Sequence, residues 1–286
     1  MSILVACTSA GDAESDDTGT AVAPIIHGSN SDATEDEAVL MQVRADLGVY
    51  GCTATLLAPN LVLTARHCVT QLNDSDPTIT DTCDPRLLGA DFPAGNMSFF
   101  VGPRRPGIFA RPAAKGKQIF HDKSTEGLCG HDLALVLLDR DIPNAKLASV
   151  RLTDSTHAGE KITAVGWGMT ERTDSPDVRQ HRTGIEVVSV QPGSTPERGT
   201  AADFQVGEST CHGDSGGPAL SETTHAVIGV VSRGDNGSPD QEHAVLHCID
   251  NAGGGGKTWG VYTKTSPFKD VILRAARASG HDVKSE

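Results

Sequence analysis

Three features are missing from this chain of 286 residues, and each absence narrows the class of protein. No apolar run approaches the roughly 18 residues that a transmembrane helix needs. No C-x-x-C pair is present, which argues against a zinc site or a dithiol redox motif. No basic patch offsets the formal net charge of −13, and residues 1–40 contain no Lys or Arg. Such an acidic chain argues against nucleic acid as a partner, and we expect neither a metal nor a cofactor.

The N-terminal 24 residues differ in composition from the rest of the chain. LVAC at 4–7 looks like a bacterial lipobox, in which Cys7 would be lipidated, and a polar stretch rich in Gly, Ser and Asp follows. Only six residues precede Cys7, so either a longer signal peptide precedes this start or the motif is accidental. We favour the first hypothesis. Residues 1–24 are then a leader, pro-segment or lipoprotein tether, with a lipid anchor through Cys7.

Beyond residue 24 the sequence alternates short apolar runs with turn residues, a pattern typical of an all-β protein. The runs are VLMQV, ATLLA, LVLTA, SFFV, LALVLL, ITAVGW, IEVVSV, AVIGVVS and TWGVYT. One helix is well signalled at 266–280, with Ser266 as N-cap, Pro267 at the first helical position and Gly280 as the stop. The chain therefore reads as strands followed by a C-terminal helix.

The string GDSGGP at 213–218 raises the question of a nucleophile, because glycines surround Ser215. The string matches the G-x-S-x-G nucleophile elbow of α/β-hydrolases, but by itself it is compatible with two unrelated folds. LTARHC at 63–68 and HDLAL at 131–135 supply His67 and Asp132 earlier in the chain. The order His, Asp, Ser, together with a strand and not a helix after the serine, argues against an α/β-hydrolase.

With these motifs in order, the sequence resembles the trypsin-like serine proteases, which have the chymotrypsin fold. The resemblance also rests on IIHG at 25–28, GWG at 166–168, VVSRG at 230–234 and GVYT at 260–263. It implies an all-β fold in which two six-stranded antiparallel β-barrels pack together and a C-terminal helix follows. Residues 25–286 are expected to form this protease domain, with one barrel in each of two subdomains.

The residue types explain the chemistry that the resemblance implies. A serine hydroxyl is a weak nucleophile near neutral pH, so His67 acts as general base and then as general acid. Asp132 orients the imidazole and stabilises the imidazolium. The backbone N–H groups of Gly213 and Ser215 form the oxyanion hole. The expected catalytic residues are therefore His67, Asp132 and Ser215.

The resemblance implies a zymogen that is cut before Ile25. The new ammonium group of Ile25 then pairs with Asp214 and orders the oxyanion loop. Pro24 precedes that bond, where a trypsin-like activator would require Arg or Lys. This departure argues against activation by a trypsin-like protease in trans. We expect another processing protease or another route, and low activity in the intact chain.

The resemblance also implies a substrate-binding set, which consists of Ser209, Ser232, Gly234 and Gly260. Ser209 stands where relatives that prefer Arg or Lys carry Asp, so we expect an apolar or aromatic P1 residue. Arg233 stands where the family usually has a Trp. It either favours acidic residues upstream of the scissile bond or is a surface residue paired with Asp235.

Seven cysteines in one chain favour an oxidising compartment, and we expect a secreted or cell-envelope protein. The resemblance pairs Cys52 with Cys68, near His67, and Cys211 with Cys248, near Ser215. Cys83 and Cys129 then remain as a possible third pair. The acidic run at 73–81 lacks the carboxylate spacing of a calcium loop, so a solvated loop is expected there.

The sequence thus predicts a serine endopeptidase that acts through an acyl-enzyme on protein or peptide substrates, as a monomer. The alternative from another class is a catalytically silent binding protein on a protease fold. Intact His67, Asp132 and Ser215 argue against that alternative.

Overall fold

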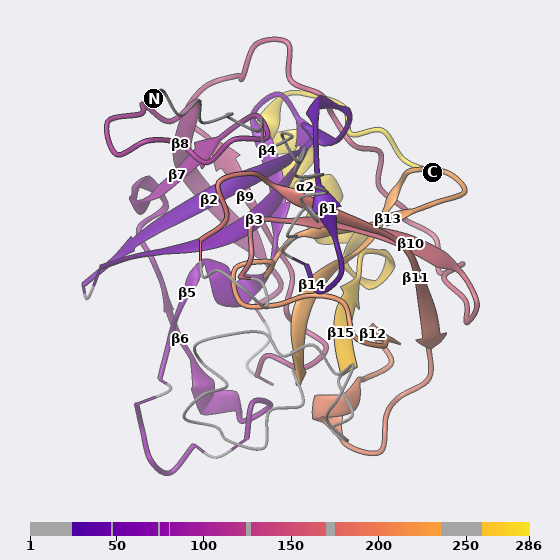
Figure 1. Cartoon of the computed structure of the whole chain (residues 1–286). Coiled ribbons are helices and arrows are strands. Elements are labelled where there is room, and N and C mark those ends of the chain that lie inside the picture. The colour runs from indigo at the N-terminus through magenta and orange to yellow at the C-terminus, as the bar shows by residue number, and fades with distance from the viewer. Residues whose placement is uncertain are drawn as a thin grey trace, which may run out of the picture.

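The computed structural model describes residues 25–46, 48–73, 75–79, 81–123, 127–169, 175–235 and 259–286. The predictions for Cys7, Pro24 and Cys248 lie outside these ranges. Most of the described secondary structure is β-strand, arranged as two barrels that lie side by side (Figure 1).

The first barrel closes in the strand order β2-β3-β4-β9-β8-β7, and every pairing is antiparallel. Its inward-facing side chains form an apolar core that includes Met41, Leu56 and Phe99, all essentially inaccessible to solvent. The strands are β2 (Ala38–Ala45), β3 (Gly48–Ala58), β4 (Leu61–Thr64), β7 (Met97–Phe100), β8 (Ala114–His121) and β9 (Ala134–Leu138).

The second barrel runs β11-β10-β13-β14-β15-β12, and the pairing of β12 with β11 closes the ring. A short strand, β1 (Ser29–Asn30), adds to the outer edge of β11. The core includes Phe204 stacked on Tyr262, with ring centroids 5.2 Å apart. The strands are β10 (Lys161–Gly166), β11 (Gln180–Ser189), β12 (Asp203–Val206), β13 (Pro218–Ser221), β14 (Val227–Asp235) and β15 (Trp259–Lys264).

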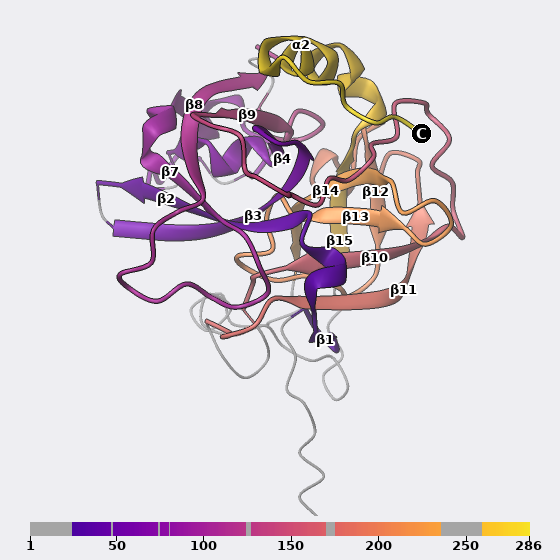
Figure 2. The same cartoon turned by 90° about the horizontal axis from the view of Figure 1, so that it is seen from above.

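The C-terminal segment begins as a 3₁₀ turn, η7 (Ser266–Phe268), and continues as α2 (Lys269–Ser279). Gly280 ends the helix with φ 76°, a left-handed conformation that favours glycine. The predicted helix is therefore present, but Ser266 makes no capping hydrogen bond because the chain enters through the 3₁₀ turn. Figure 2 shows α2 lying against the first barrel, where it packs chiefly on β4, β8 and β9. No helix in the described ranges is long and apolar enough to cross a membrane.

Several short elements lie outside the two barrels. A two-stranded sheet pairs β5 (Thr70–Leu72) with β6 (Leu88–Asp91). The remaining 3₁₀ turns are η1 (Ala33–Glu35), η2 (Arg66–Cys68), η3 (Pro85–Leu87), η4 (Ala94–Asn96) and η5 (Pro196–Arg198).

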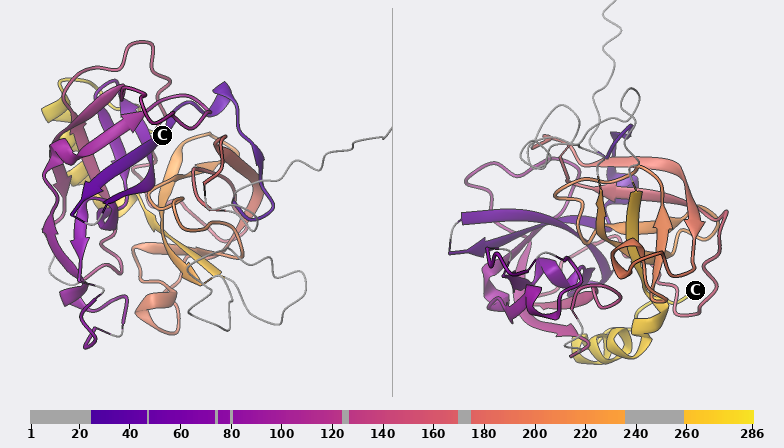
Figure 3. Two further views of the ribbon diagram at one scale, coloured as in Figure 1. Left: turned by 60° about the vertical axis from the view of Figure 1, so that its left-hand side comes forward. Right: turned by 90° about the horizontal axis from the view of Figure 1, so that it is seen from below.

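One apolar cluster joins the two barrels and the helix. It contains Leu63 of β4, Val165 of β10, Leu220 of β13 and Ile272 of α2, each at most 1% exposed. The further views in Figure 3 show both barrels and the yellow helix beside the first of them. The predicted fold class is confirmed, and the barrel junction is where the motif residues meet.

Candidate active site

Three loops bring the candidate catalytic residues to the barrel junction. His67 lies in η2, directly after β4 of the first barrel. Asp132 lies just before β9 of the same barrel, and Ser215 lies just before β13 of the second. The site therefore draws one face from each barrel.

His67 and Asp132 form a buried pair. His67 Nδ1 lies 2.8 Å from Asp132 Oδ2, and the backbone N–H of His67 donates to Oδ1 over 2.9 Å. Because a carboxylate can only accept, the proton of the neutral imidazole is held on Nδ1 and Nε2 is left as the base. Burial alone would lower the pKa of His67, but the Asp132 carboxylate raises it above its ordinary value. Burial opposes ionisation of Asp132, yet His67 and the hydrogen bonds around it hold its pKa below the ordinary value.

Ser232 completes the hydrogen bonding of this carboxylate. Its hydroxyl donates to Asp132 Oδ2 over 2.7 Å, and both side chains are buried. Ser232 was expected at the substrate-binding face, and the structure adds a contact with Asp132 that the sequence did not reveal. Asp132 thus accepts three hydrogen bonds, which a fully buried carboxylate needs in order to remain ionised.

The nucleophile loop is fastened to the first barrel by Thr53 of β3. Its backbone N–H donates to Ser215 O over 2.9 Å, and its hydroxyl donates to Gly213 O over 3.0 Å. The same hydroxyl accepts the N–H of Trp167 over 3.1 Å. Cys68 Sγ, next to His67 in sequence, lies 3.6 Å from Ser215 O. Thr53 therefore ties the loop that carries Ser215 to the barrel that carries His67.

Ser215 Oγ makes no hydrogen bond to His67 within the described part of the chain. Such contacts are often long in an enzyme without substrate, so this geometry does not exclude general-base catalysis. Glycine at 216 is required by the fold, because an added Cβ would lie 2.1 Å from Thr64 Oγ1 and φ is +77°. The serine is thus held by a loop that fits tightly against β3 and β4.

The expected oxyanion donors, Gly213 and Ser215, have backbone N–H groups that make no hydrogen bond to any described residue. Gly213 has φ +98°, and an added Cβ would lie 2.9 Å from Gly168 Cα. Only glycine suits both the conformation and the close approach. The expected oxyanion role requires that both N–H groups lack a protein acceptor, as they do among the described residues.

Asp214 is fully buried beneath the loop. Its carboxylate accepts the N–H of Gly168 over 2.8 Å and the N–H of Cys211 over 2.9 Å. An added Cβ at Gly166 or Gly168 would overlap the carboxylate, so these glycines make room for it. Burial raises the pKa of Asp214 to about 7, although the two backbone hydrogen bonds partly offset this effect. No cation pairs with it among the residues described.

Ile25, the expected partner of Asp214, is also buried. Its side chain is 0% exposed and belongs to the apolar core of the second barrel. Its backbone has φ 54°, an unusual conformation for a β-branched residue, and its carbonyl accepts the N–H of Gly28 over 2.6 Å. The bond from Pro24 to Ile25 lies at the edge of the described residues.

The expected specificity residues gather at the ends of β14 and β15. Gly234 and Gly260 face each other in register, and an added Cβ at Gly234 would lie 2.6 Å from Trp259 O. Ser209 is 2% exposed, and its hydroxyl lies 3.2 Å from where a Gly260 Cβ would stand. Tyr262 is buried here too, and burial raises its pKa well above the ordinary value. The described lining therefore offers a hydroxyl where basic-specific relatives would offer a carboxylate.

Disulfides brace the site. Cys52 bonds to Cys68 beside His67, and Cys83 bonds to Cys129 beside the Asp132 loop. Cys211 is also in a disulfide, but its expected partner Cys248 is outside the described ranges. Cys52, His67 and Cys68 lie close enough together to hold a metal ion. Because both sulfurs are used in a disulfide, they are not available as thiolate ligands.

The structure corrects one alternative for Arg233. Its side chain is only 6% exposed and pairs with Asp203 over 2.8 Å, so it is not a surface residue. Its guanidinium group also donates to the carbonyl oxygens of Pro196 and Glu197. The side chain of Asp235, the partner expected from sequence, lies outside the described part.

Two β-barrels with a His–Asp pair and a glycine-rich serine loop at their junction define a protein of the chymotrypsin fold. The sequence model of the Trypsin family matches residues 25–91 and 104–272. The chain belongs to the trypsin family.

Curated relatives agree with this assignment at low identity. The chain is 24% identical over 267 residues to trypsin of Saccharopolyspora erythraea, covering 89% of this chain and 99% of that protein. It is 25% identical over 257 residues to anionic trypsin of Canis lupus familiaris, with 86% and 87% coverage. It is 26% identical over 208 residues to phenoloxidase-activating factor 3 of Holotrichia diomphalia, with 65% coverage of this chain. The chain spans 57% of that last protein's length.

Proposed function

We propose that this chain is a serine endopeptidase in which Ser215 attacks the scissile carbonyl and forms an acyl-enzyme. The observation that carries the proposal is the buried pair of His67 Nδ1 and Asp132 Oδ2, 2.8 Å apart, which leaves Nε2 as a base at the barrel junction. Membership of the trypsin family supports a hydrolase that acts on peptide bonds.

The reaction follows from the placement of the groups. His67 Nε2 accepts the Ser215 Oγ proton as the Oγ–C bond forms, and the N–H groups of Gly213 and Ser215 bind the oxyanion. The imidazolium, stabilised by Asp132, then gives the proton to the leaving amine as the C–N bond breaks. Water attacks the acyl group with the same base, and Ser215 is regenerated.

We propose an apolar or aromatic P1 preference. Among the described residues expected to line this pocket, Gly234 and Gly260 have no side chain, and Ser209 supplies a hydroxyl and no negative charge. Kinetics on matched peptides with Phe, Leu, Ala or Arg at P1 test this preference. A higher kcat/KM for Arg than for Phe would refute it.

We further propose activation by cleavage before Ile25. The support is the buried carboxylate of Asp214, whose raised pKa of about 7 is what a carboxyl group awaiting a cation would have. The Ile25 ammonium would supply that cation and order the oxyanion loop. N-terminal sequencing of active material tests this proposal, because active chains beginning well before Ile25 would contradict it.

We also propose a domain organisation and an extracellular location for the chain. Residues 1–24 act as a leader or tether, with a lipid anchor through Cys7, and residues 25–286 form the protease domain, which works as a monomer on protein or peptide substrates. The two disulfides fit an extracellular protein.

Burst kinetics with an activated ester test the mechanism. An acyl-enzyme gives a burst of leaving group close to one equivalent per enzyme, followed by slower turnover. The matched variant Ser215→Ala should give no burst. A wild-type protein that binds peptides but shows no burst after removal of residues 1–24 would favour a binding protein on a protease fold.

A further inference from the structure

Arg233 lies one residue beyond Ser232 and makes four hydrogen bonds with its guanidinium group. Nη1 donates to Ser232 Oγ over 3.1 Å, and Nε donates to Glu197 O over 2.9 Å. Nη2 donates to Pro196 O over 2.9 Å and to Asp203 Oδ2 over 2.8 Å. These four bonds involve all three guanidinium nitrogens, so the position of the side chain is fixed from several directions.

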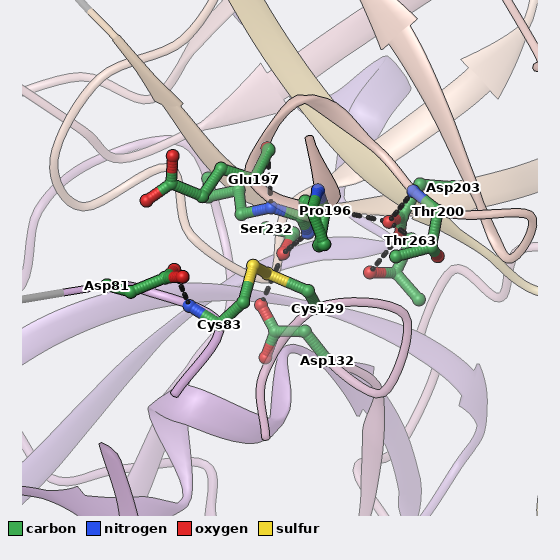
Figure 4. Close-up of a disulfide and its surroundings, with 11 residues drawn as sticks. Asp81, Cys83, Cys129, Asp132, Pro196, Glu197, Thr200, Asp203, Ser232 and Thr263 are labelled. Atoms are coloured by element: carbon green, nitrogen blue, oxygen red, sulfur yellow. Dashed lines mark hydrogen bonds and ion pairs between the residues drawn. A yellow bond between two sulfur atoms is a disulfide. The ribbon is translucent and has the colours of Figure 1, made fainter. Parts of the chain in front are cut away.

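Asp203 anchors the guanidinium and is itself held in place. Its side chain is 0% exposed, and Oδ2 also accepts the N–H and the hydroxyl of Thr200, both over 2.9 Å. Oδ1 accepts the hydroxyl of Thr263 over 3.2 Å. Figure 4 shows Asp203, Thr200 and Thr263 on one side of this network, with Ser232 and Asp132 on the other. A buried ion pair with this many hydrogen bonds has a defined geometry.

The donors and acceptors impose a direction on the chain of hydrogen bonds. A guanidinium can only donate, so Ser232 Oγ must accept from Arg233. A serine hydroxyl has one proton, which then points to Asp132 Oδ2, 2.7 Å away. Without Arg233, no donor would fix the direction of that hydroxyl. With it, an Nη1–H of Arg233 points to Ser232 Oγ, and the Ser232 proton points to the carboxylate that orients His67.

We propose that Arg233 is a positioning residue for the catalytic pair: it fixes the Ser232 hydroxyl as a donor to Asp132 and so helps to hold Nδ1–H of His67 towards the same carboxylate. This inference rests on the proposed function of His67 and Asp132. This role is distinct from the two alternatives that the sequence suggested for Arg233.

Other charged groups stand near the pair and must be considered in any pH experiment. Arg66, next to His67 in the chain, lies 3.6 Å from Asp122, which also pairs with His131, next to Asp132, at 2.6 Å. These three groups lie on the first barrel, whereas Arg233 and Asp203 lie on the second. Variants at 233 and 203 therefore act on Asp132 from the second-barrel side and leave these ion pairs in place.

The test compares Arg233→Met with Ser232→Ala, Asp203→Asn and the double variant Ser232→Ala/Arg233→Met. Loss of the fixed donor makes the carboxylate of Asp132 more basic, so it holds the imidazolium more tightly. We expect kcat per active site to fall about tenfold at unchanged KM in Arg233→Met. The acid limb of the pH profile should move to higher pH. Ser232→Ala should move it in the same direction, and the double variant no further.

Asp203→Asn separates positioning from simple electrostatics. It keeps the guanidinium beside Ser232 and removes a negative charge, so the acid limb should stay in place or move to lower pH. Arg140→Met is the matched control, because Arg140 forms an exposed ion pair with Asp139 far from this network. It should change neither kcat nor the profile.

A double variant and an NMR titration complete the test. Arg233→Met leaves Asp203 buried without its partner, so Arg233→Met/Asp203→Asn provides a neutral version if the single variant does not fold. NMR titration of His67 in each folded variant does not require turnover, so it tests the proposal even if the wild-type protein proves inactive. An unchanged His67 titration and an unchanged kcat per active site in both Arg233 variants would overturn the proposal.

Discussion

Replacing Asp214 with Asn in the intact chain should change stability in a way that depends strongly on pH. The fully buried carboxyl group accepts two backbone N–H groups, and burial raises its pKa from 3.8 to about 7. An acid whose pKa is raised on folding stabilises the protein below its unfolded pKa, and that stabilisation is lost as the pH rises through the folded pKa. Asn resembles the neutral acid at every pH.

The magnitude follows from the difference between the folded and unfolded pKa values, at about 1.4 kcal/mol for each tenfold change in proton affinity. Ionised Asp214 therefore costs the folded, uncleaved chain about 4 kcal/mol. We expect Asp214→Asn to stabilise this chain by about 4 kcal/mol more at about pH 8 than at about pH 4. After cleavage before Ile25 the sign should reverse at pH 8, because the variant then leaves a buried ammonium group unpaired.

Urea unfolding at both pH values measures this double difference, with Ser215→Ala as background so that neither form digests itself. Comparison with the parent at each pH cancels the other titrating groups. An equal effect of Asp214→Asn at the two pH values would refute the reasoning. So would a variant that stabilises the cleaved and the intact forms alike.

Further predictions concern the loop, the pocket, the base and the barrel edge. Thr53→Val should lower the free energy of unfolding by about 1–3 kcal/mol, because Gly213 O and the N–H of Trp167 lose their partner; urea denaturation measures this, and a neutral effect would contradict the role of the hydroxyl. Ser209→Asp should raise kcat/KM for a P1 Arg substrate and lower it for Phe, as steady-state kinetics would show; no change in the ratio would place Ser209 outside the pocket. Because Asp132 raises the pKa of His67, the acid limb of kcat/KM should lie above the ordinary histidine value of 6.5, and Asp132→Asn should lower it. Arg179→Met should destabilise the protein by about 3–5 kcal/mol, since the fully buried guanidinium donates to Ser31, Ala38 and Asp36; a two-state unfolding curve close to that of the parent would argue against this estimate.

The sequence predicted the barrels well where the strands were strongly apolar. The run LALVLL became β9 and AVIGVVS became most of β14, both buried inside the barrels. Strand β8 was not predicted, because its sequence AKGKQIFH has charged residues on the solvent face and a glycine that must be small. An added Cβ at Gly116 would lie 2.3 Å from Ala94 O. Strand β12 was also missed, since four residues with an Asp and a Gln carry little periodic signal.

The candidate site could be located from motifs, but its supporting contacts could not. The motifs predicted that His67 and Asp132 pair, and in the structure His67 Nδ1 lies 2.8 Å from Asp132 Oδ2. Nothing in the sequence predicted a role for Thr53, because its three hydrogen bonds to the Ser215 loop and to Trp167 join residues more than 100 positions apart. The surface-residue alternative for Arg233 was wrong because its partner Asp203 lies on another strand, and no local pattern connects the two.

Covalent labelling of Ser215 tests the central claim most directly. The chain beginning at Ile25 is treated with an organophosphonate, and the modified peptide is identified by mass spectrometry, with His67→Ala and Ser215→Ala as controls. The account predicts stoichiometric modification at Ser215, slowed by orders of magnitude in His67→Ala and abolished in Ser215→Ala. Absence of labelling at Ser215 in a folded protein, or labelling that does not depend on His67, would contradict it.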